Sequence, residues 1–477
     1  MTNIQASKAI RPFGWRDKIG YMFGDFGNDF TFILQMMFFM VFYTDIMGIE
    51  AAHVGLLFLV ARIVDAFTDV GMGRVVDVLK PSGGGRFRPW LLRMSIPVAL
   101  AGASMFMPFM AEASYGVRIA YMCVTYLLWG SVFYTSINIP YGSMAAVVTD
   151  DPGQRASLSV FRSLGANLAY LIISAVLPQI VIVDNRIDPT RMAIAAVVCG
   201  VLAVVCYVLC WSNVQERIEA KVAGPAERIG FVQMLGTLGR NRALISLVAG
   251  AIVFLVGSQI AGTTTTYLWK DYFQRGDLMS LAQIISVAPV FILALVASWL
   301  AAKVGKKETI AVTLAIAAVV AIICWILRIT NPFVFIAAFF IISIGVGMYN
   351  ILVWAVITDV LDAQDVATGQ RDDGTIYAIY SWSRKLGQAL AGYIVGWAVS
   401  AVGYSAEAAK AGQAQSPEAV SGIYMLFLLI PGILYAITAV IMWFWFPLGR
   451  KKVLDNVEIL RARKEAAEAQ APAPAQS

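Results

Sequence analysis

The sequence predicts an all-α membrane protein with twelve transmembrane helices, and two observations lead to that prediction. The chain has 477 residues, of which 59% are hydrophobic and only 14% are charged, and its mean hydropathy is +0.73. A water-soluble protein of this size could not keep so apolar a composition dispersed. Apolar runs also recur along the whole chain, and runs of roughly 20 to 30 residues are long enough to cross about 30 Å of hydrocarbon.

The predicted spans are separated by short segments whose charge alternates. They are residues 19–45, 51–79, 89–110, 115–148, 157–183, 192–211, 243–268, 278–302, 309–328, 332–360, 375–402 and 423–446. Lysines and arginines gather in every second connecting segment, and cytoplasmic segments carry such an excess. Residues 1–14 lack the apolar core of a signal peptide. We therefore expect a multi-pass protein of a bacterial-type cytoplasmic membrane, with both termini in the cytoplasm.

The longest polar interruption, residues 212–242, divides the chain into two six-helix halves. It predicts an amino-terminal half (1–211), a cytoplasmic middle loop (212–242), a carboxy-terminal half (243–447) and a cytoplasmic tail (448–477). Residues 147–165 resemble residues 356–387, as expected if the halves are parallel repeats that face a central cavity. Chance similarity between two apolar, glycine-bearing segments is the alternative.

Several function classes do not fit this chain. All five cysteines lie in apolar runs without C-x-x-C spacing, and His53 is the only histidine. These facts argue against a disulfide framework, a zinc site and a histidine-based catalytic triad, so we expect a protein that is not an enzyme. The net charge of +6 is spread over the interhelical segments, which topology explains better than a nucleic-acid partner. The charges cluster in the amino-terminal half, whereas a channel needs polar groups along one continuous pore.

Two segments beside the spans also carry predictions. The glycine-rich loop 81–90 has no following Lys-Ser or Lys-Thr, so it is not expected to bind a nucleotide. Arg86 and Arg88 in that loop can cap carbonyl ends or pair with Asp77. Residues 450–464 alternate basic and apolar side chains at helical spacing, which predicts a helix that lies on the inner leaflet. The tail beyond it is rich in Ala, Pro and Gln, and we expect it to be disordered.

Asp65 and Asp69 form the most informative polar pair in the chain. They lie four residues apart in an apolar run, so both carboxylates are on one face of one helix. Ionisable groups within a membrane span are costly unless they are paired, hydrated or bound to an ion. The pair therefore predicts a cation site. The alternative is that Asp65 pairs with Arg62 near the cytoplasmic surface.

Seven collinear segments resemble the signature segments of the glycoside-pentoside-hexuronide:cation symporters, the melibiose-carrier branch of the major facilitator superfamily. These segments are residues 24–30, 43–48, 62–69, 85–90, 138–142, 155–162 and 385–387. The resemblance implies a major facilitator fold and import of a sugar or glycoside together with Na⁺, Li⁺ or H⁺. Beyond the co-transported ion it implies no cofactor. We expect a small-molecule sugar, a monovalent cation and the lipid bilayer as partners, and a monomer.

The resemblance also assigns site residues. For the cation it implies Asp65 and Asp69, with Thr135 and Asn138 as neutral oxygen ligands, and for the substrate it implies Asp29, Asn138, Arg162 and Lys385. Hard cations prefer oxygen ligands, and carboxylates accept hydrogen bonds from sugar hydroxyls. An arginine inside the membrane also needs an anion, which Asp29, Asp65 or Asp69 can supply. The alternative for Arg162 is a residue that extends its side chain to the cytoplasmic interface.

The chain departs from the melibiose pattern at two positions. The galactoside carriers have an aspartate where Asn138 stands and a tryptophan where Gly142 stands. The lost carboxylate and the lost aromatic platform argue against a melibiose-like galactoside. Arg384 beside Lys385 favours a uronide or another acidic glycoside, unless Arg384 faces the cytoplasmic rim. An amphipathic substrate, such as a lysolipid or a drug, is the alternative within the carrier class.

Overall fold

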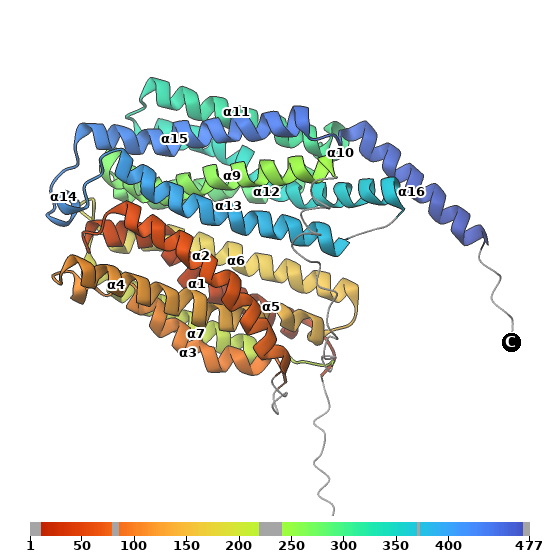
Figure 1. Cartoon of the computed structure of the whole chain (residues 1–477), viewed down its shortest axis with the longest axis horizontal. Coiled ribbons are helices and arrows are strands. Elements are labelled where there is room, and N and C mark those ends of the chain that lie inside the picture. The colour runs from red at the N-terminus through yellow and green to blue at the C-terminus, as the bar shows by residue number, and fades with distance from the viewer. Residues whose placement is uncertain (1–10, 79–84, 219–240, 370–372, 471–477) are drawn as a thin grey trace, which may run out of the picture. The chain divides into compact units, whose positions relative to one another are not determined.

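The computed structural model describes residues 11–78, 85–218, 241–369 and 373–470, and α-helices dominate these ranges (Figure 1). The chain forms two compact units. Unit 1 comprises Met1–Ala226, Thr265–Ile284 and Val395–Ser421, and unit 2 comprises Glu227–Thr264, Ile285–Ile394 and Gly422–Ser477. Several helices of the second half of the sequence therefore contribute one end to unit 1 and the remainder to unit 2.

Unit 1 is built around α1, which packs along α6 and α7. Its helices are α1 (Trp15–Asp45), α2 (Ala51–Val78), α3 (Arg88–Ser104), α4 (Tyr115–Leu127), α5 (Thr135–Val148), α6 (Pro152–Val181), α7 (Pro189–Asn213) and the short α14 (Ala406–Lys410). The π-helical segment η2 (Leu128–Tyr134) joins α4 to α5 without a break, and single 3₁₀ turns occupy η1 (Pro108–Met110) and η4 (Gly276–Leu278). A two-stranded antiparallel hairpin, β1 (Ile182–Val183) and β2 (Arg186–Ile187), connects α6 to α7.

Local sequence signals explain where α6 and α7 begin. Asp151 and Asp188 each precede a proline, and each carboxylate accepts a hydrogen bond from the backbone N–H three residues later, at 2.8 Å in both cases. An aspartate cap followed by proline at the first helical position satisfies the free N–H groups of a helix start without losing a needed donor. Both helix starts are therefore encoded locally.

The remaining helices lie mostly in unit 2. They are α9 (Arg242–Tyr267), α10 (Met279–Val304), α11 (Lys306–Leu327), α12 (Pro332–Thr368), α13 (Asp373–Ala401), α15 (Pro417–Val440) with the π-helical η5 (Ile441–Trp445), and α16 (Arg450–Gln470). The π-helical η3 (Leu268–Tyr272), which continues α9, belongs to unit 1. Helices α11 and α12 approach each other closely at Gly345. A Cβ atom at this position would lie only 2.5 Å from the carbonyl oxygen of Thr313. Only glycine fits that contact.

Each of the twelve predicted spans forms a helix in the structure. Nine of the helices in the described residues are long and apolar enough to cross a membrane; α3, with 17 residues, is too short to be counted among them. The number of crossings and the division into halves at 212–242 stay predictions, since residues 219–240 lie outside the described ranges. The tail beyond residue 470 lies outside them as well.

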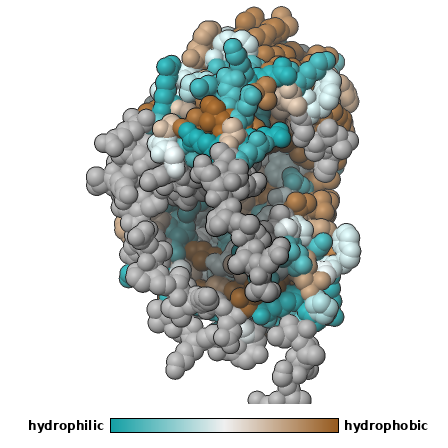
Figure 2. Space-filling view, turned by 90° about the vertical axis from the view of Figure 1, so that its right-hand side faces the viewer, coloured by the Kyte–Doolittle hydropathy of each residue, from teal (hydrophilic) through white to brown (hydrophobic). Residues whose placement is uncertain are grey.

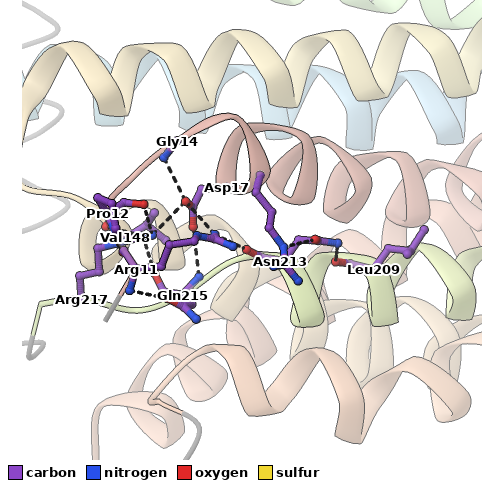
Figure 3. A network of polar contacts seen from close by, with 10 residues as sticks. Arg11, Pro12, Gly14, Asp17, Val148, Leu209, Asn213, Gln215 and Arg217 are labelled. Carbon is purple, nitrogen blue, oxygen red and sulfur yellow. Dashed lines mark hydrogen bonds and ion pairs between the residues drawn. The ribbon is translucent and has the colours of Figure 1, made fainter. Parts of the chain in front are cut away.

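A buried ionic network fastens the start of α1 to the segment that follows α7 (Figure 3). Asp17 is fully buried, and its carboxylate lies 2.9 Å from Nη2 of Arg217 and 3.0 Å from Nη2 of Arg11. The Arg217 side chain also donates to backbone carbonyls of Pro12 and Val148. Two guanidinium groups compensate one buried carboxylate, so this network fixes the position of α1 and of the polar residues along it.

The loop before α3 confirms the predicted capping by arginine. Nε of Arg86 donates to the carbonyl of Val76 at 3.0 Å, and Nε of Arg88 donates to the carbonyl of Trp211 at 2.6 Å. Glu216 accepts the backbone N–H groups of residues 86 to 88 at 2.7–2.9 Å, which places a negative charge at the amino terminus of α3. The predicted partner Asp77 has no described side chain.

The predicted helix over residues 450–464 is confirmed as α16. Its exposed side chains include the apolar Leu454 and Val457 among lysines and arginines. Figure 2 looks at the side that faces right in Figure 1, and it shows hydrophilic side chains interspersed with hydrophobic ones. Contact of α16 with the inner leaflet stays a prediction.

Candidate cation and substrate site

One face of α1 carries two carboxylates, and an arginine of α6 meets one of them. Asp25 and Asp29 lie four residues apart, and Nε of Arg162 lies 3.1 Å from Oδ1 of Asp25. The Asp25 side chain is 13% exposed and the Arg162 side chain 40%. Asp29 lies one helical turn after Asp25, on the same face of α1. We call Asp25, Asp29 and Arg162 the Arg162 cluster.

Asp25 was not among the residues predicted from the sequence, although the signal was there. The spacing that singled out Asp65 and Asp69 also relates Asp25 to Asp29, since both pairs are four residues apart. The anions considered for Arg162 were Asp29, Asp65 and Asp69, whereas the ion pair that the structure shows is with Asp25.

Two tyrosines hold α1 against α5 next to this cluster. The hydroxyl of Tyr141 donates to the carbonyl of Tyr21 at 2.7 Å, the hydroxyl of Tyr21 donates back to the carbonyl of Tyr141 at 3.3 Å, and the two rings stack. The guanidinium carbon of Arg162 lies 5.4 Å from the centre of the Tyr141 ring, within the range of a cation–π interaction. Both tyrosines are buried, so Arg162 packs against an aromatic pair that is shielded from solvent.

The predicted site residue Asn138 of α5 is connected to α1 through a second amide. Nδ2 of the buried Asn28 donates to Oδ1 of Asn138 at 3.3 Å, and the hydroxyl of Tyr207 on α7 donates to Oδ1 of Asn28 at 2.9 Å. Tyr207 thereby fixes which way the Asn28 amide points, and this in turn presents a donor to Asn138. The carbonyl oxygen of Asn138 is therefore oriented by α1 and α7.

The carboxylates of α2 meet hydroxyl groups of the π-helical segment and of α5. Oγ of Ser131 lies 2.6 Å from Oδ1 of Asp65, and Oγ1 of Thr135 lies 3.0 Å from Oδ1 of Asp69. Ser131 was not predicted, but it precedes Thr135 by four residues and so shares its helical face. π-helical turns are frequent at functional sites. Here the turn brings two hydroxyls to the two carboxylates.

Arg62 pairs with Asp65 at the same time, with 3.4 Å between Nη1 and Oδ2. The structure thus contains both the acidic pair and the Arg62–Asp65 contact that the sequence left as alternatives. Among the described residues no group of three or more His, Cys, Asp or Glu side chains gathers as in a multi-carboxylate metal centre. The structure thus brings two carboxylates and two hydroxyls together, and their role in binding a cation stays a prediction.

The remaining predicted residue, Lys385, lies on α13 in unit 2. It is exposed, and its neighbour Arg384 is half-buried, with its guanidinium carbon 5.4 Å from the centre of the Trp354 ring. Trp354 belongs to α12, so Arg384 is packed against unit 2 itself rather than extended into solvent.

A second ion cluster lies at the carboxyl-terminal end of α1 and was not predicted. Nζ of Lys270 lies 2.8 Å from Oδ2 of Asp45 and 2.6 Å from Oδ1 of Asp271, and the hydroxyl of Tyr404 donates to Oδ1 of Asp45 at 2.8 Å. We call these four residues the Lys270 cluster. The Lys270 side chain is only 7% exposed. Lys270, Asp45 and Asp271 line one side of a cavity of about 570 Å³.

The sequence matches known proteins over most of its length. Residues 20–450 match the family described as MFS/sugar transport protein. A glucuronide carrier protein homolog of Escherichia coli (strain K12) is 30% identical over 457 residues, 94% of this chain and 96% of that protein. An isoprimeverose transporter of Lactiplantibacillus pentosus is 28% identical over 437 residues, 90% of this chain and 88% of that protein.

Solved structures share the fold at low sequence identity. A variant of the nucleoside transporter NupG has a TM-score of 0.63 and 13% identity, covering 90% of this chain and 100% of that one. A bacterial homolog of the human lysosomal transporter Spinster has a TM-score of 0.62 and 11% identity, covering 92% and 97%. These similarities identify an all-α, MFS-like fold.

Proposed function

Because the chain belongs to the MFS/sugar transport family, and within it to the glycoside-pentoside-hexuronide:cation symporters, we propose that it imports a sugar, glycoside or uronide together with Na⁺ or H⁺. As a member of this family it is a multi-pass membrane transporter and not an enzyme. The relatives named as a glucuronide carrier homolog and an isoprimeverose transporter support a sugar-related substrate.

The observation that carries the proposal is the contact of the two α2 carboxylates with two hydroxyls. Asp65 and Asp69 supply charged oxygens, and Ser131 and Thr135 supply neutral ones. Such a set suits a hard monovalent cation, which prefers oxygen ligands. Four oxygen-bearing side chains favour Na⁺ over H⁺, because a proton needs only one carboxylate of raised pKa.

The substrate half of the proposal rests on the α1–α6 face. Asp29, Asn138 and Arg162 combine acceptors and donors, as the hydroxyls of a sugar require. The resemblance also assigns Lys385 of α13 to the substrate, and we retain that assignment as part of the proposal. Apart from the co-transported ion, no cofactor takes part in this proposal.

Coupling follows from the charge of the α2 site. Arg62, Asp65 and Asp69 carry a formal charge of −1, and enclosing uncompensated charge in a low dielectric costs several kcal/mol. A bound cation removes that cost. The carrier should therefore change conformation readily when cation and sugar are both bound, and poorly with either alone, which is the thermodynamic basis of symport. We expect one cation per substrate.

Transport in proteoliposomes tests the proposal. A gradient of Na⁺, Li⁺ or H⁺ is imposed across the membrane, one ion at a time, and the uptake of labelled glycosides, uronides and pentosides is measured. A labelled lysolipid represents the alternative substrate class. We expect uptake of at least one sugar that accelerates with one of the ion gradients. Uptake of the lysolipid alone, or sugar flux that no gradient alters, would contradict the proposal.

The variant Asp69→Asn separates coupling from binding. Removing one of the two cation-site charges should abolish gradient-driven accumulation while leaving some downhill sugar exchange, because the α1–α6 face stays intact. Asp150→Asn, which removes an exposed carboxylate, is the control and should accumulate sugar as the unaltered protein does. Uphill accumulation by Asp69→Asn with unchanged ion dependence would show that the α2 pair does not couple transport.

A further inference from the structure

We propose that Asp25 sets the charge preference of the substrate site, by holding Arg162 in an ion pair so that this part of the site accepts hydroxyls and rejects a carboxylate or sulfonate. The inference rests on the proposed sugar transport and extends it. Nothing in the resemblance assigns a role to Asp25. Its case rests on three features of the structure: the ion pair, the space beside the guanidinium and the charge balance around it.

The ion pair engages one edge of the Arg162 guanidinium. The contact that the structure shows joins Nε to Oδ1 of Asp25, whereas an arginine presents five N–H donors in a planar fork. Arg162 is 40% exposed and Asp25 only 13%. The Nη groups are therefore the part of the pair that a ligand can reach.

Gly142 leaves room next to these Nη groups. A Cβ atom built at Gly142 would lie 3.8 Å from Nη1 of Arg162, and among the described residues no other atom outside the helix backbone comes within 4 Å of that position. The melibiose pattern fills this position with a tryptophan, which would occupy the space. In this chain a substituent of the substrate can lie against the guanidinium instead.

The charge balance decides which substituent is favoured there. Asp25 already compensates the charge of Arg162, so this ion pair is neutral before any ligand arrives. A hydroxyl can donate to a carboxylate and accept from a guanidinium N–H. A carboxylate can only accept, and it would lie beside the like charge of Asp25 in a partly buried site, where such repulsion is strong.

The test uses two compounds that differ at one carbon. These are 4-nitrophenyl β-glucoside, with a neutral CH₂OH group at C6, and 4-nitrophenyl β-glucuronide, with a carboxylate there. Binding of each to the purified full-length chain is measured by titration calorimetry at saturating Na⁺. In Asp25→Asn the ratio of glucuronide affinity to glucoside affinity should rise about tenfold or more over that of the unaltered protein, because Arg162 loses its anionic partner.

Two further variants make the test specific. Asp25→Glu restores the charge and should return the ratio to within about threefold of the original, which also shows that position 25 tolerates substitution. Asp29→Asn replaces the neighbouring carboxyl group without breaking the ion pair, so it should weaken binding of both compounds and shift the ratio less than Asp25→Asn. An unchanged ratio in Asp25→Asn, or equal shifts in both asparagine variants, would overturn the role of Asp25.

The outcome also separates this inference from the proposed function. If neither compound binds to the unaltered protein or to any variant, the result contradicts the proposed glycoside transport. The proposed role of Asp25 is then contradicted as well. If both compounds bind and the ratio of their affinities does not change with the residue at position 25, the proposed sugar transport is not contradicted, and only the role of Asp25 is wrong.

Discussion

Two clusters along α1 have the same ionic composition but differ in how completely their charges are satisfied. The Arg162 cluster and the Lys270 cluster each combine two carboxylates with one cation. Nζ of Lys270 lies within 2.8 Å of both of its carboxylates and is 7% exposed, whereas Arg162 shows one ion-pair contact, at 3.1 Å, and is 40% exposed.

The difference leads us to expect different roles for the two clusters. Thr44 and Tyr404 add hydrogen bonds to Asp45, so the charges of the Lys270 cluster are satisfied within the protein even though three of its residues line a cavity. The cation of the Arg162 cluster makes fewer contacts and is more exposed. We therefore expect the Lys270 cluster to stabilise the structure and the Arg162 cluster to take part in recognition of the substrate.

The largest expected effect is on stability, from Lys270→Met. This substitution leaves Asp45 and Asp271 buried without their cation, which should lower the free energy of unfolding by about 3–5 kcal/mol. Arg162→Met is the matched control and should cost less, because Arg162 and its environment are more exposed. Thermal unfolding of both variants in detergent measures the difference, and equal losses would remove the distinction between the two clusters.

The next effect concerns substrate affinity. Asp29→Asn should weaken binding of the transported sugar by about 1.5–3 kcal/mol, the contribution of a hydrogen bond to a charged group, and change ion affinity much less. Asp271→Asn, the corresponding change in the Lys270 cluster, should leave sugar affinity within about twofold. Titration calorimetry measures both affinities. Normal sugar affinity with lost ion binding in Asp29→Asn would reverse the assignment of that residue.

The sequence predicted the helices well because their signals are local. Apolar length located all twelve ranges, and an aspartate before a proline marks the starts of α6 and α7. The contact of Thr135 with Asp69 joins two residues that were both assigned to the cation site. That contact agrees with the assignment, although the role of the two residues in ion binding stays a prediction.

The pairings that the sequence did not predict join residues far apart in the chain. Arg162 is 137 residues from Asp25, and Tyr404 is 359 residues from Asp45. Spacing along one helix reveals which side chains share a face, but it does not reveal which face of another helix packs against it. The four-residue spacing could have identified Asp25, whereas the pairing of Lys270 with Asp45 could be found only in the folded structure.

The smallest expected effects come from two tyrosine hydroxyls, one near the Arg162 cluster and one within the Lys270 cluster. Tyr207→Phe removes the donor that orients Asn28, and Tyr404→Phe removes a donor to Asp45. Each should lower the free energy of unfolding by about 0.5–1.5 kcal/mol: the Tyr207 bond is neutral, and Asp45 keeps Lys270 and Thr44 as partners.

Sugar affinity should distinguish these two variants. Without Tyr207 the amide of Asn28 can turn, so Asn138 loses its fixed donor and the site loses part of its preorganisation. Tyr207→Phe should therefore weaken sugar binding severalfold, while Tyr404→Phe should leave it unchanged, because the Lys270 cluster is saturated without the ligand. Calorimetric titration of both variants at saturating cation measures this contrast, and equal loss of affinity in the two would mean that the clusters do not differ in their access to substrate.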